Sequence, residues 1–157
     1  YLFQNWFDFN ESIFNKEISK IQNNLILNTP TKQKFLKVSG CEIDREVFLQ
    51  AENNIYLSGF SQYIEIHNKD FSDLKMDIKP GIIVCNPPYG KKLGEENELI
   101  QLYVNIGTYL KNNFSGWEFW LLSGNPALTR YLKMKASLKI PVSNGGIDCR
   151  WIKYLIR

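Results

Sequence analysis

The sequence has few cysteines and a single histidine, and each shortage excludes a class of protein. Its three cysteines, Cys41, Cys85 and Cys149, are odd in number and share no close spacing, which argues against a disulfide framework or a zinc knuckle. Each lies in an apolar context, where a reduced cysteine behaves as a small buried hydrophobe, so we expect a cytoplasmic protein. Only His67 could serve a histidine-dependent metal site or a Ser-His-Asp triad, so we expect no metal.

Long apolar runs are also missing. No run approaches the roughly 20 residues that a membrane-spanning helix needs, and the first ten residues lack the basic start and apolar stretch of a signal peptide. Hydrophobic residues make up 44% of the 157 residues and aromatics 14%, which is typical of one globular domain or part of a larger one. The net charge of +3 favours a polyanionic partner only weakly, because the many Lys, Asn and Ile residues can follow from AT-rich codons.

Strand and helix patterns alternate along the chain. After a helical lead-in over residues 1–35, capped at Asn10 and ending in a turn at Thr29-Pro30-Thr31, strands are predicted at 35–41, 63–66, 81–85 and 117–122. Helices are predicted from Asp44 to Gly59, over 99–110 and after the Asn125-Pro126 pair, and an antiparallel hairpin over 137–142 and 147–156. The apolar segment 81–85 suits a central parallel strand covered on both faces. The order predicts a doubly wound α/β sheet with an edge hairpin.

The tetrapeptide Asn86-Pro87-Pro88-Tyr89 directly follows this most apolar strand. In an open α/β sheet, ligands bind beyond the carboxyl ends of the strands. The two prolines fix φ and remove two backbone donors, so the loop is stiff and its carbonyls are available as acceptors. Asn86 adds an acceptor and a donor, and Tyr89 adds a flat ring on which a base can stack. The loop suits a planar amine, although Asn-Pro also forms ordinary turns.

This tetrapeptide resembles the (D/N/S)-P-P-(Y/F) motif of S-adenosylmethionine-dependent methyltransferases that modify exocyclic amines. The resemblance implies a Rossmann-like class I methyltransferase sheet. It also implies that Glu42 accepts hydrogen bonds from the ribose of the cofactor and that Ile43 packs on its adenine. Asp70 would accept from the adenine amino group, and Phe71 would flank the ring. From the residues alone, Asp70 is better explained by a turn than by a ligand role, and Asp44 by a helix N-cap.

The resemblance narrows to the THUMP-associated (UPF0020) RNA guanine methyltransferases of the RlmL type, which act on large-subunit ribosomal RNA. The segment 86–94 resembles their NPPYGxRLG pattern, with Lys92 in the place of the usual arginine. Lys91 and Lys92 are predicted RNA phosphate contacts, although a solvated pair explains them equally well. Three further segments also resemble this type: 3–9, 122–126 and 144–150.

The implied reaction is methyl transfer to the 2-amino group of a guanine in ribosomal RNA, a step of rRNA processing. Asn86 and the Pro87 carbonyl would accept the protons of the amine, and Tyr89 would stack on the base. With Pro88 these form the predicted catalytic set, and Asn86 would also contact the cofactor. The alternatives are a tRNA guanine or DNA adenine methyltransferase, or a noncatalytic RNA-binding or assembly module.

Glycine is absent from residues 1–39. The implied family begins with a strand, a glycine-rich loop and a helix, and that strand lies between the strands ending at Cys41 and Cys85. We therefore expect residues 1–157 to be the C-terminal part of one methyltransferase domain, with 36–157 forming the remaining sheet and helices. The missing N-terminal part of the same protein would be a partner of this chain. The chain alone is expected to bind S-adenosylmethionine weakly and to be inactive by itself.

Overall fold

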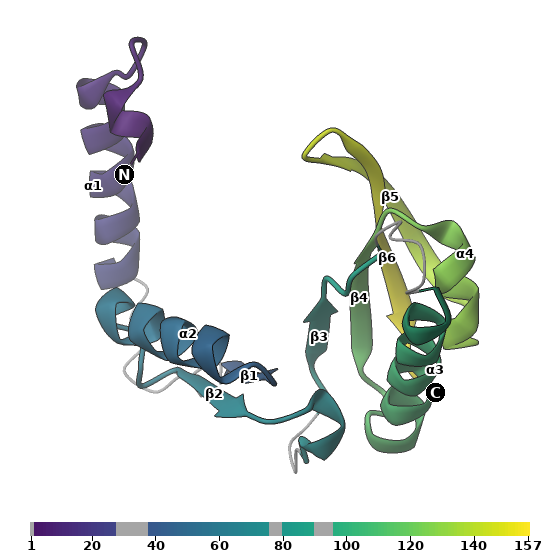
Figure 1. The fold of residues 1–157 in the computed structure, drawn as a ribbon. Helices are drawn as coiled ribbons and strands as arrows, with labels where there is room; N and C mark the ends of the chain where they lie inside the picture. Colours follow the sequence, from purple (N-terminus) through teal and green to yellow (C-terminus); the bar gives the residue numbers. More distant parts are fainter. Residues whose placement is uncertain (1, 28–37, 76–79, 90–95) are drawn as a thin grey trace.

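The computed structural model describes residues 2–27, 38–75, 80–89 and 96–157 (Figure 1). The turn expected at Thr29-Pro30-Thr31 and the pair Lys91 and Lys92 lie outside the described residues. The elements are η1 (Leu2–Asn5), α1 (Glu11–Leu27), β1 (Val38–Glu42), α2 (Arg45–Ser58), β2 (Ile64–Asn68), η2 (Phe71–Asp73), β3 (Ile82–Cys85), α3 (Glu96–Asn113), β4 (Glu118–Ser123), α4 (Pro126–Thr129), η3 (Arg130–Leu132), β5 (Ala136–Asn144) and β6 (Ile147–Leu155). Their order matches the alternation predicted from the sequence.

The strands form two separate sheets. In the first, β1 pairs with β2 in parallel, and α2 packs against both strands. The second has the order β3-β4-β6-β5, in which β3 and β4 are parallel and β6 runs antiparallel to both of its neighbours. The C-terminal hairpin is therefore present, with β5 at a sheet edge as predicted. The division falls between the strands ending at Glu42 and Cys85, where the sequence analysis places the missing strand.

The prediction that the strand ending at Cys85 is covered on both faces is wrong. Ile82 and Val84 are 63% and 65% exposed, whereas Ile83 and Cys85, which point to the other face, are half-buried against the core. Among the described residues β3 pairs only with β4. The composition of β3 is therefore typical of a strand buried on both faces, but in this structure only the face with Ile83 and Cys85 packs against the core.

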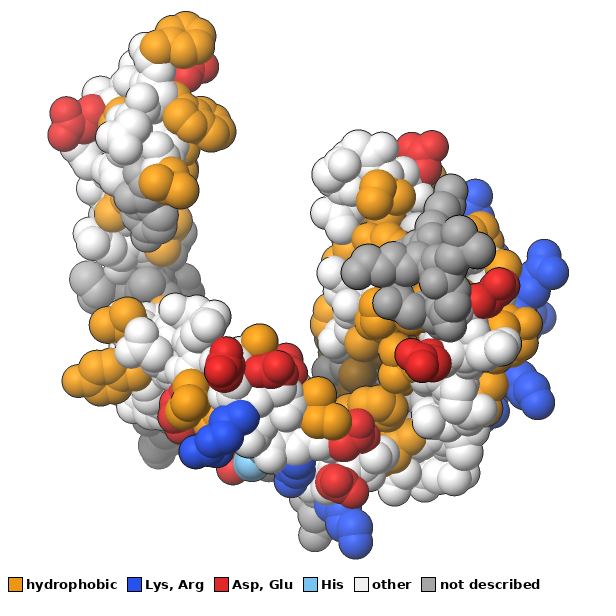
Figure 2. Space-filling view, viewed as in Figure 1, with side chains coloured by type: hydrophobic (Ala, Val, Ile, Leu, Met, Phe, Trp, Pro, Cys, Tyr) orange, Lys and Arg blue, Asp and Glu red, His pale blue; other side chains and the backbone are white. Residues whose placement is uncertain are grey.

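The hydrophobic core lies in the second half of the chain. It is built from α3, β4, α4, η3 and β6, and its buried members are Tyr103, Ile106, Leu110, Phe114, Trp117, Phe119, Leu121, Leu128, Leu132, Ile152, Tyr154 and Ile156. No described residue before Pro87 is buried. The β1–β2 layer thus leaves many of its apolar side chains exposed, and Figure 2 shows several of them on its surface.

Local signals set the ends of the helices. The Asp44 side chain accepts from the backbone N–H of Glu46 and Val47 at 2.8 and 3.0 Å, so it caps α2 as the sequence predicts. Gly59 ends that helix with φ 74°, a left-handed conformation that glycine adopts at little cost. Asn125 caps α4.

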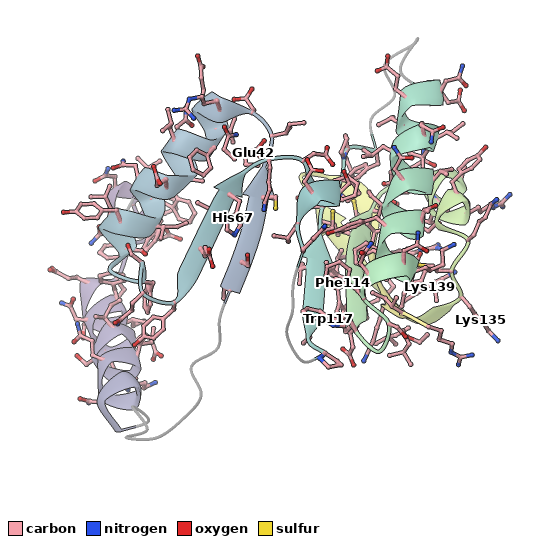
Figure 3. The ribbon with its side chains drawn as sticks, turned by 90° about the horizontal axis from the view of Figure 1, so that it is seen from below. Glu42, His67, Phe114, Trp117, Lys135 and Lys139 are labelled. Carbon is pink, nitrogen blue, oxygen red and sulfur yellow. The ribbon has the colours of Figure 1, made fainter. Side chains whose placement is uncertain are left out.

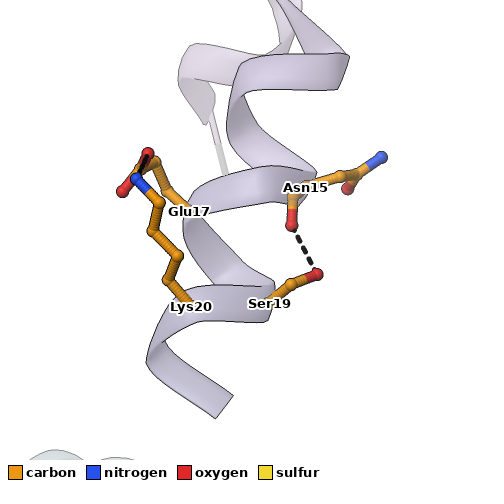
Figure 4. A network of polar contacts seen from close by, with 4 residues as sticks. All are labelled: Asn15, Glu17, Ser19 and Lys20. Carbon is orange, nitrogen blue, oxygen red and sulfur yellow. Dashed lines mark hydrogen bonds and ion pairs between the residues drawn. The ribbon is translucent and has the colours of Figure 1, made fainter. Parts of the chain in front are cut away.

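The α1 helix projects from the β1–β2 layer (Figure 1). Asn10 caps it, as predicted, by accepting from the N–H of Ile13 at 3.0 Å. Polar contacts follow along its surface: Glu17 pairs with Lys20 at 2.6 Å, and the Ser19 hydroxyl donates to the Asn15 carbonyl at 2.8 Å (Figure 4). Exposed pairs of this kind add only about 0.3–0.5 kcal/mol each, so they give α1 little stability without a packing partner.

Candidate active site

The Tyr89 side chain is held by residues of the C-terminal hairpin. Asn144 Nδ2 donates to the Tyr89 hydroxyl at 3.1 Å from the end of β5, and Cys149 Sγ lies 3.5 Å from the same oxygen. The ring is half-buried and packs against the core. The loop after β3 is therefore fastened to residues 55 and 60 positions further along the chain.

Gly124, just past the end of β4, lies close to the Cε2 and Cδ2 atoms of this ring. A Cβ atom at Gly124 would lie 2.9 Å from Tyr89 Cε2, 3.1 Å from Cδ2 and 3.2 Å from Cys149 Sγ. Real Cβ atoms essentially never approach a heavy atom within 3.0 Å. Only glycine leaves room here, so the strand end and the hairpin together fix the position of the Tyr89 ring.

The other three residues of the tetrapeptide differ in exposure. Pro87 is buried, which anchors the loop, whereas Asn86 and Pro88 are exposed. Within the described part of the chain, no hydrogen bond is formed by the Asn86 side chain. An anchored loop thus presents an exposed amide three residues before a fixed aromatic ring, and such a loop could hold a planar amine.

Glu42 ends β1 in a half-buried position (Figure 3). Its Oε1 accepts from the N–H of Asp44 at 2.8 Å, which orients the carboxylate. Asn68, at the end of the neighbouring β2, donates to the carbonyls of Glu42 and Ile43 at 2.9 and 3.2 Å and so fixes the turn that follows β1. Ile43 is 69% exposed. An oriented carboxylate and an exposed aliphatic side chain fit the ribose and the adenine of a nucleoside cofactor.

Asp70 and Phe71 follow β2. Asp70 Oδ1 accepts from both the backbone N–H and the hydroxyl of Ser72, at 2.8 and 2.5 Å, so Asp70 acts as the cap of η2. Phe71 packs edge-on against Tyr109 of α3, with ring centroids 5.5 Å apart. The Tyr109 hydroxyl also donates to the Leu74 carbonyl. The loop after β2 is therefore docked on α3, and both predicted cofactor residues also have structural roles.

Burial raises the pKa of two titratable groups beneath the loop. It raises the pKa of the Cys85 thiol, and it is the main cause that raises the pKa of the Tyr103 hydroxyl, which lies beside Cys85 and Tyr89. Neither of these two groups is ionised near neutral pH. In the ranges that the structure describes, no group of three or more His, Cys, Asp and Glu side chains could hold a metal, and the cysteines are free thiols.

A comparison with protein families matches residues 6–153 to the RMKL-like methyltransferase domain, UPF0020. The chain belongs to this family. The matched residues include the tetrapeptide after β3 and every strand of the first sheet. The described residues contain no helix that is long and apolar enough to cross a membrane.

Individual relatives agree with the family. The chain is 33% identical to a Synechocystis sp. protein provisionally named an RNA methyltransferase, and 30% identical to the ribosomal RNA large subunit methyltransferase K/L of Shewanella frigidimarina. Each comparison covers 98% of this chain but only 39% and 21% of the relative. This UPF0020 chain therefore spans well under half the length of the curated relatives.

Solved structures share the fold. A possible methylase from Clostridium difficile 630 superposes with a TM-score of 0.77 at 25% identity, covering 98% of this chain and 39% of that one. A methyltransferase complexed with SAH, provisionally assigned, gives the same TM-score at 19% identity, covering 99% and 40%. The predicted α/β methyltransferase fold with its C-terminal hairpin is confirmed.

Sequence reasoning missed the contacts that hold the tetrapeptide in place. In the sequence analysis, Gly124 and Asn144 appear only within segments that resemble the family, and Cys149 only in such a segment and as a buried reduced cysteine. Their partner Tyr89 is far away in the sequence, and no local pattern indicates such a contact. One sequence signal was available at Gly124, because a glycine at the end of a buried strand often marks a place where another part of the chain approaches closely.

Proposed function

We propose that this UPF0020 domain takes part in the transfer of a methyl group from S-adenosylmethionine to the exocyclic 2-amino group of guanine in large-subunit ribosomal RNA. The observation that carries the proposal is the Tyr89 ring, fixed by Asn144 and Gly124 beside the exposed Asn86 amide. The names of the K/L relatives favour a ribosomal substrate over tRNA or DNA.

In the proposed mechanism the chain positions the amine rather than activating it by deprotonation. The 2-amino group of guanine is a poor nucleophile because its lone pair is delocalised into the ring. The Asn86 Oδ1 and the Pro87 carbonyl accept its two N–H groups, which localises the lone pair and sets its direction, while Tyr89 stacks on the base. Alignment of this kind accelerates transfer by removing the entropic cost of orientation. A guanine within a duplex must first be flipped out.

Glu42, Ile43, Asp70 and Phe71 are the proposed cofactor contacts. Glu42 has a second carboxylate oxygen for a ribose hydroxyl, Ile43 offers an exposed apolar surface to the adenine, and Asp70 has a second oxygen for the adenine amino group. When bound, S-adenosylmethionine supplies the methyl group on a sulfonium centre. We expect the remaining contacts to the cofactor to come from outside residues 1–157, because no described residue before Pro87 is buried.

The test is Asn86→Ala in the full-length protein, assayed with ribosomal RNA, tRNA and DNA. The proposal predicts loss of methyl transfer to ribosomal RNA with cofactor binding largely retained, because Asn86 aligns the amine. Asn112→Ala, at an exposed position of α3, is the matched control and should leave transfer unchanged. Undiminished turnover in Asn86→Ala contradicts the catalytic assignment. Transfer to tRNA or to adenine in DNA instead contradicts the substrate assignment.

A further inference from the structure

The charges of this chain are strongly segregated. Residues 126–157 contain seven Lys or Arg and one acidic residue, a net charge of +6, whereas residues 1–125 contain 12 basic and 15 acidic residues. The modest overall charge of +3 therefore hides one strongly basic end of the sequence. Figure 2 shows Lys and Arg side chains at the side of the β3–β6 body that faces away from β1 and β2. Such a distribution creates a local positive potential that attracts polyanions.

Three of these cations, together with Lys111 of α3, line an open pocket. Lys111, Lys133, Lys135 and Arg157 line a pocket of about 360 Å³ whose other lining residues are uncharged: Met134, Ala136, Ser137 and Leu155. The cations come from four places in the fold, namely the last turn of α3, the end of η3, the start of β5 and the end of β6. No acidic side chain lines the pocket.

The fold itself brings these four elements together. A Cβ at Gly107 would lie 2.3 Å from the Leu132 carbonyl oxygen, so a glycine there permits α3 to pack closely on η3. Lys111 lies one helical turn after Gly107, and Lys133 directly follows Leu132. Lys133 adopts a left-handed conformation, φ 51°, as the chain turns from η3 towards β5. The basic pocket is therefore a product of core packing and not of flexible tails.

Among the described residues, no acidic side chain forms an ion pair with Lys111, Lys133, Lys135 or Arg157. Lys153, by contrast, contacts Glu118 at 2.6 Å, and this pairing lowers the pKa of the Glu118 carboxyl.

Ordinary structural roles explain only part of the pocket. A lysine in the last turn of a helix interacts favourably with the helix dipole, and a lysine near an edge strand hinders pairing with other chains. These roles account for Lys111 and Lys135. They do not account for Lys133 and Arg157, which lie on other elements and face the same pocket.

Strand β5 connects this pocket with the candidate active site. Its nine residues span roughly 30 Å, from Ala136 beside the basic pocket to Asn144, which holds Tyr89. Lys139 on β5 and Arg150 on β6 line a second pocket of about 620 Å³, together with Gly124, Cys149 and one acidic residue, Asp148. Lys135 and Lys139 lie at the same side of this body in Figure 3. Cations thus follow the sheet edge from its base to the Tyr89 loop.

We propose that this edge is a binding track for the phosphate backbone of RNA, with Lys111, Lys133 and Lys135 as the contacts furthest from the reacting base and Lys139 and Arg150 as those nearest to it. The track holds nucleotides flanking the target and directs the strand towards Asn86 and Tyr89. It rests on the proposed function only in taking RNA as the polyanion.

The experiment measures the affinity for a ribosomal RNA fragment as a function of salt, with cofactor absent. The variant Lys111→Gln/Lys133→Gln/Lys135→Gln removes three cations from the track. Lys16→Gln/Lys20→Gln/Lys75→Gln removes three from the other half of the chain and serves as the matched control. Each phosphate contact to a single strand contributes about 0.7 to the slope of log K against log[salt], or about fivefold in affinity at 0.1 M salt relative to 1 M. The track variant should therefore lose about 100-fold at 0.1 M salt and about 2 units of slope.

The outcomes are distinct from those of the methyl-transfer assay. A loss in the track variant with little change in the control supports the track, even if the substrate of the enzyme proves to be a different RNA. The proposed track is overturned if the two variants lose affinity for RNA equally, or if the slope of log K against log[salt] is unchanged in the track variant. Either result counts even if Asn86→Ala abolishes methyl transfer. Loss of binding to inorganic phosphate without loss of binding to RNA also overturns it, because the pocket would then hold a free anion. Thermal unfolding of each variant verifies that the lost charges did not unfold the chain.

Discussion

Gly124→Ala should slow methyl transfer because the added methyl group displaces the Tyr89 ring. The added methyl group would lie 2.9 Å from Tyr89 Cε2, whereas carbon atoms in contact are normally about 3.5–4.0 Å apart. The ring must therefore shift by about 0.6–1 Å. A swing of the whole side chain about χ1 is opposed because the hydroxyl is held by Asn144, and the same methyl group would also lie 3.2 Å from Cys149 Sγ. A displacement of this size in a positioning group costs about 100-fold in rate, and overpacking costs about 1–3 kcal/mol in stability.

The assay compares kcat and KM for ribosomal RNA in the full-length protein. We expect kcat to fall about 100-fold and cofactor binding to be retained, since Glu42 and Asp70 lie on other elements. Gly40→Ala is the matched control, because a Cβ at Gly40 meets no atom within 4 Å. A Gly124→Ala enzyme that is folded and has an unchanged kcat would refute the reasoning, because the position of the Tyr89 ring would then be irrelevant to the reaction.

Two further predictions concern stability and cofactor binding. Gly107→Ala places a Cβ 2.3 Å from the Leu132 carbonyl oxygen and 2.8 Å from its Cα, so η3 must move away from α3. A cost of about 3 kcal/mol lowers the melting temperature by roughly 6–12 °C, and a melt within 2 °C of the Gly40→Ala control would contradict this. Calorimetry of residues 1–157 with S-adenosylmethionine should show binding weaker than about 1 μM, or −8.2 kcal/mol, because the β1–β2 layer has no buried core; micromolar or tighter binding would show that the layer closes by itself.

Local signals were sufficient to predict most of the elements. The caps at Asn10, Asp44 and Asn125 and the glycine at position 59 all act as the sequence indicates, because each effect depends on residues within one turn. The hairpin was equally predictable, since Gly145 and Gly146 adopt φ values of 58° and 78° that glycine tolerates best.

Long-range features could not be predicted in the same way. The residues that hold Tyr89 are 35 to 60 positions away, and no periodicity relates them. The exposure of Ile82 and Val84 was also unpredictable from composition, because Ile-Ile-Val-Cys gives no polar alternation that would mark an open face. The apolar composition of β3 indicates that the strand is suited to burial on both faces. It does not indicate whether both faces are covered in this structure.

The two sheets must keep a fixed position relative to each other for the proposed reaction to occur. The proposed cofactor carboxylates, Glu42 and Asp70, follow strands of the first sheet, whereas Asn86 follows a strand of the second. A methyl group can pass in line only if these strand ends stay fixed relative to each other. In the described residues the docking of Phe71 and Leu74 on Tyr109 links the two halves. One aromatic contact is worth about 0.5–1.5 kcal/mol beyond its buried area, which is too little to hold them rigidly. Among the described residues β1 pairs only with β2 and β3 only with β4, so each sheet has an edge at which a further strand between the sheets would join them through backbone hydrogen bonds.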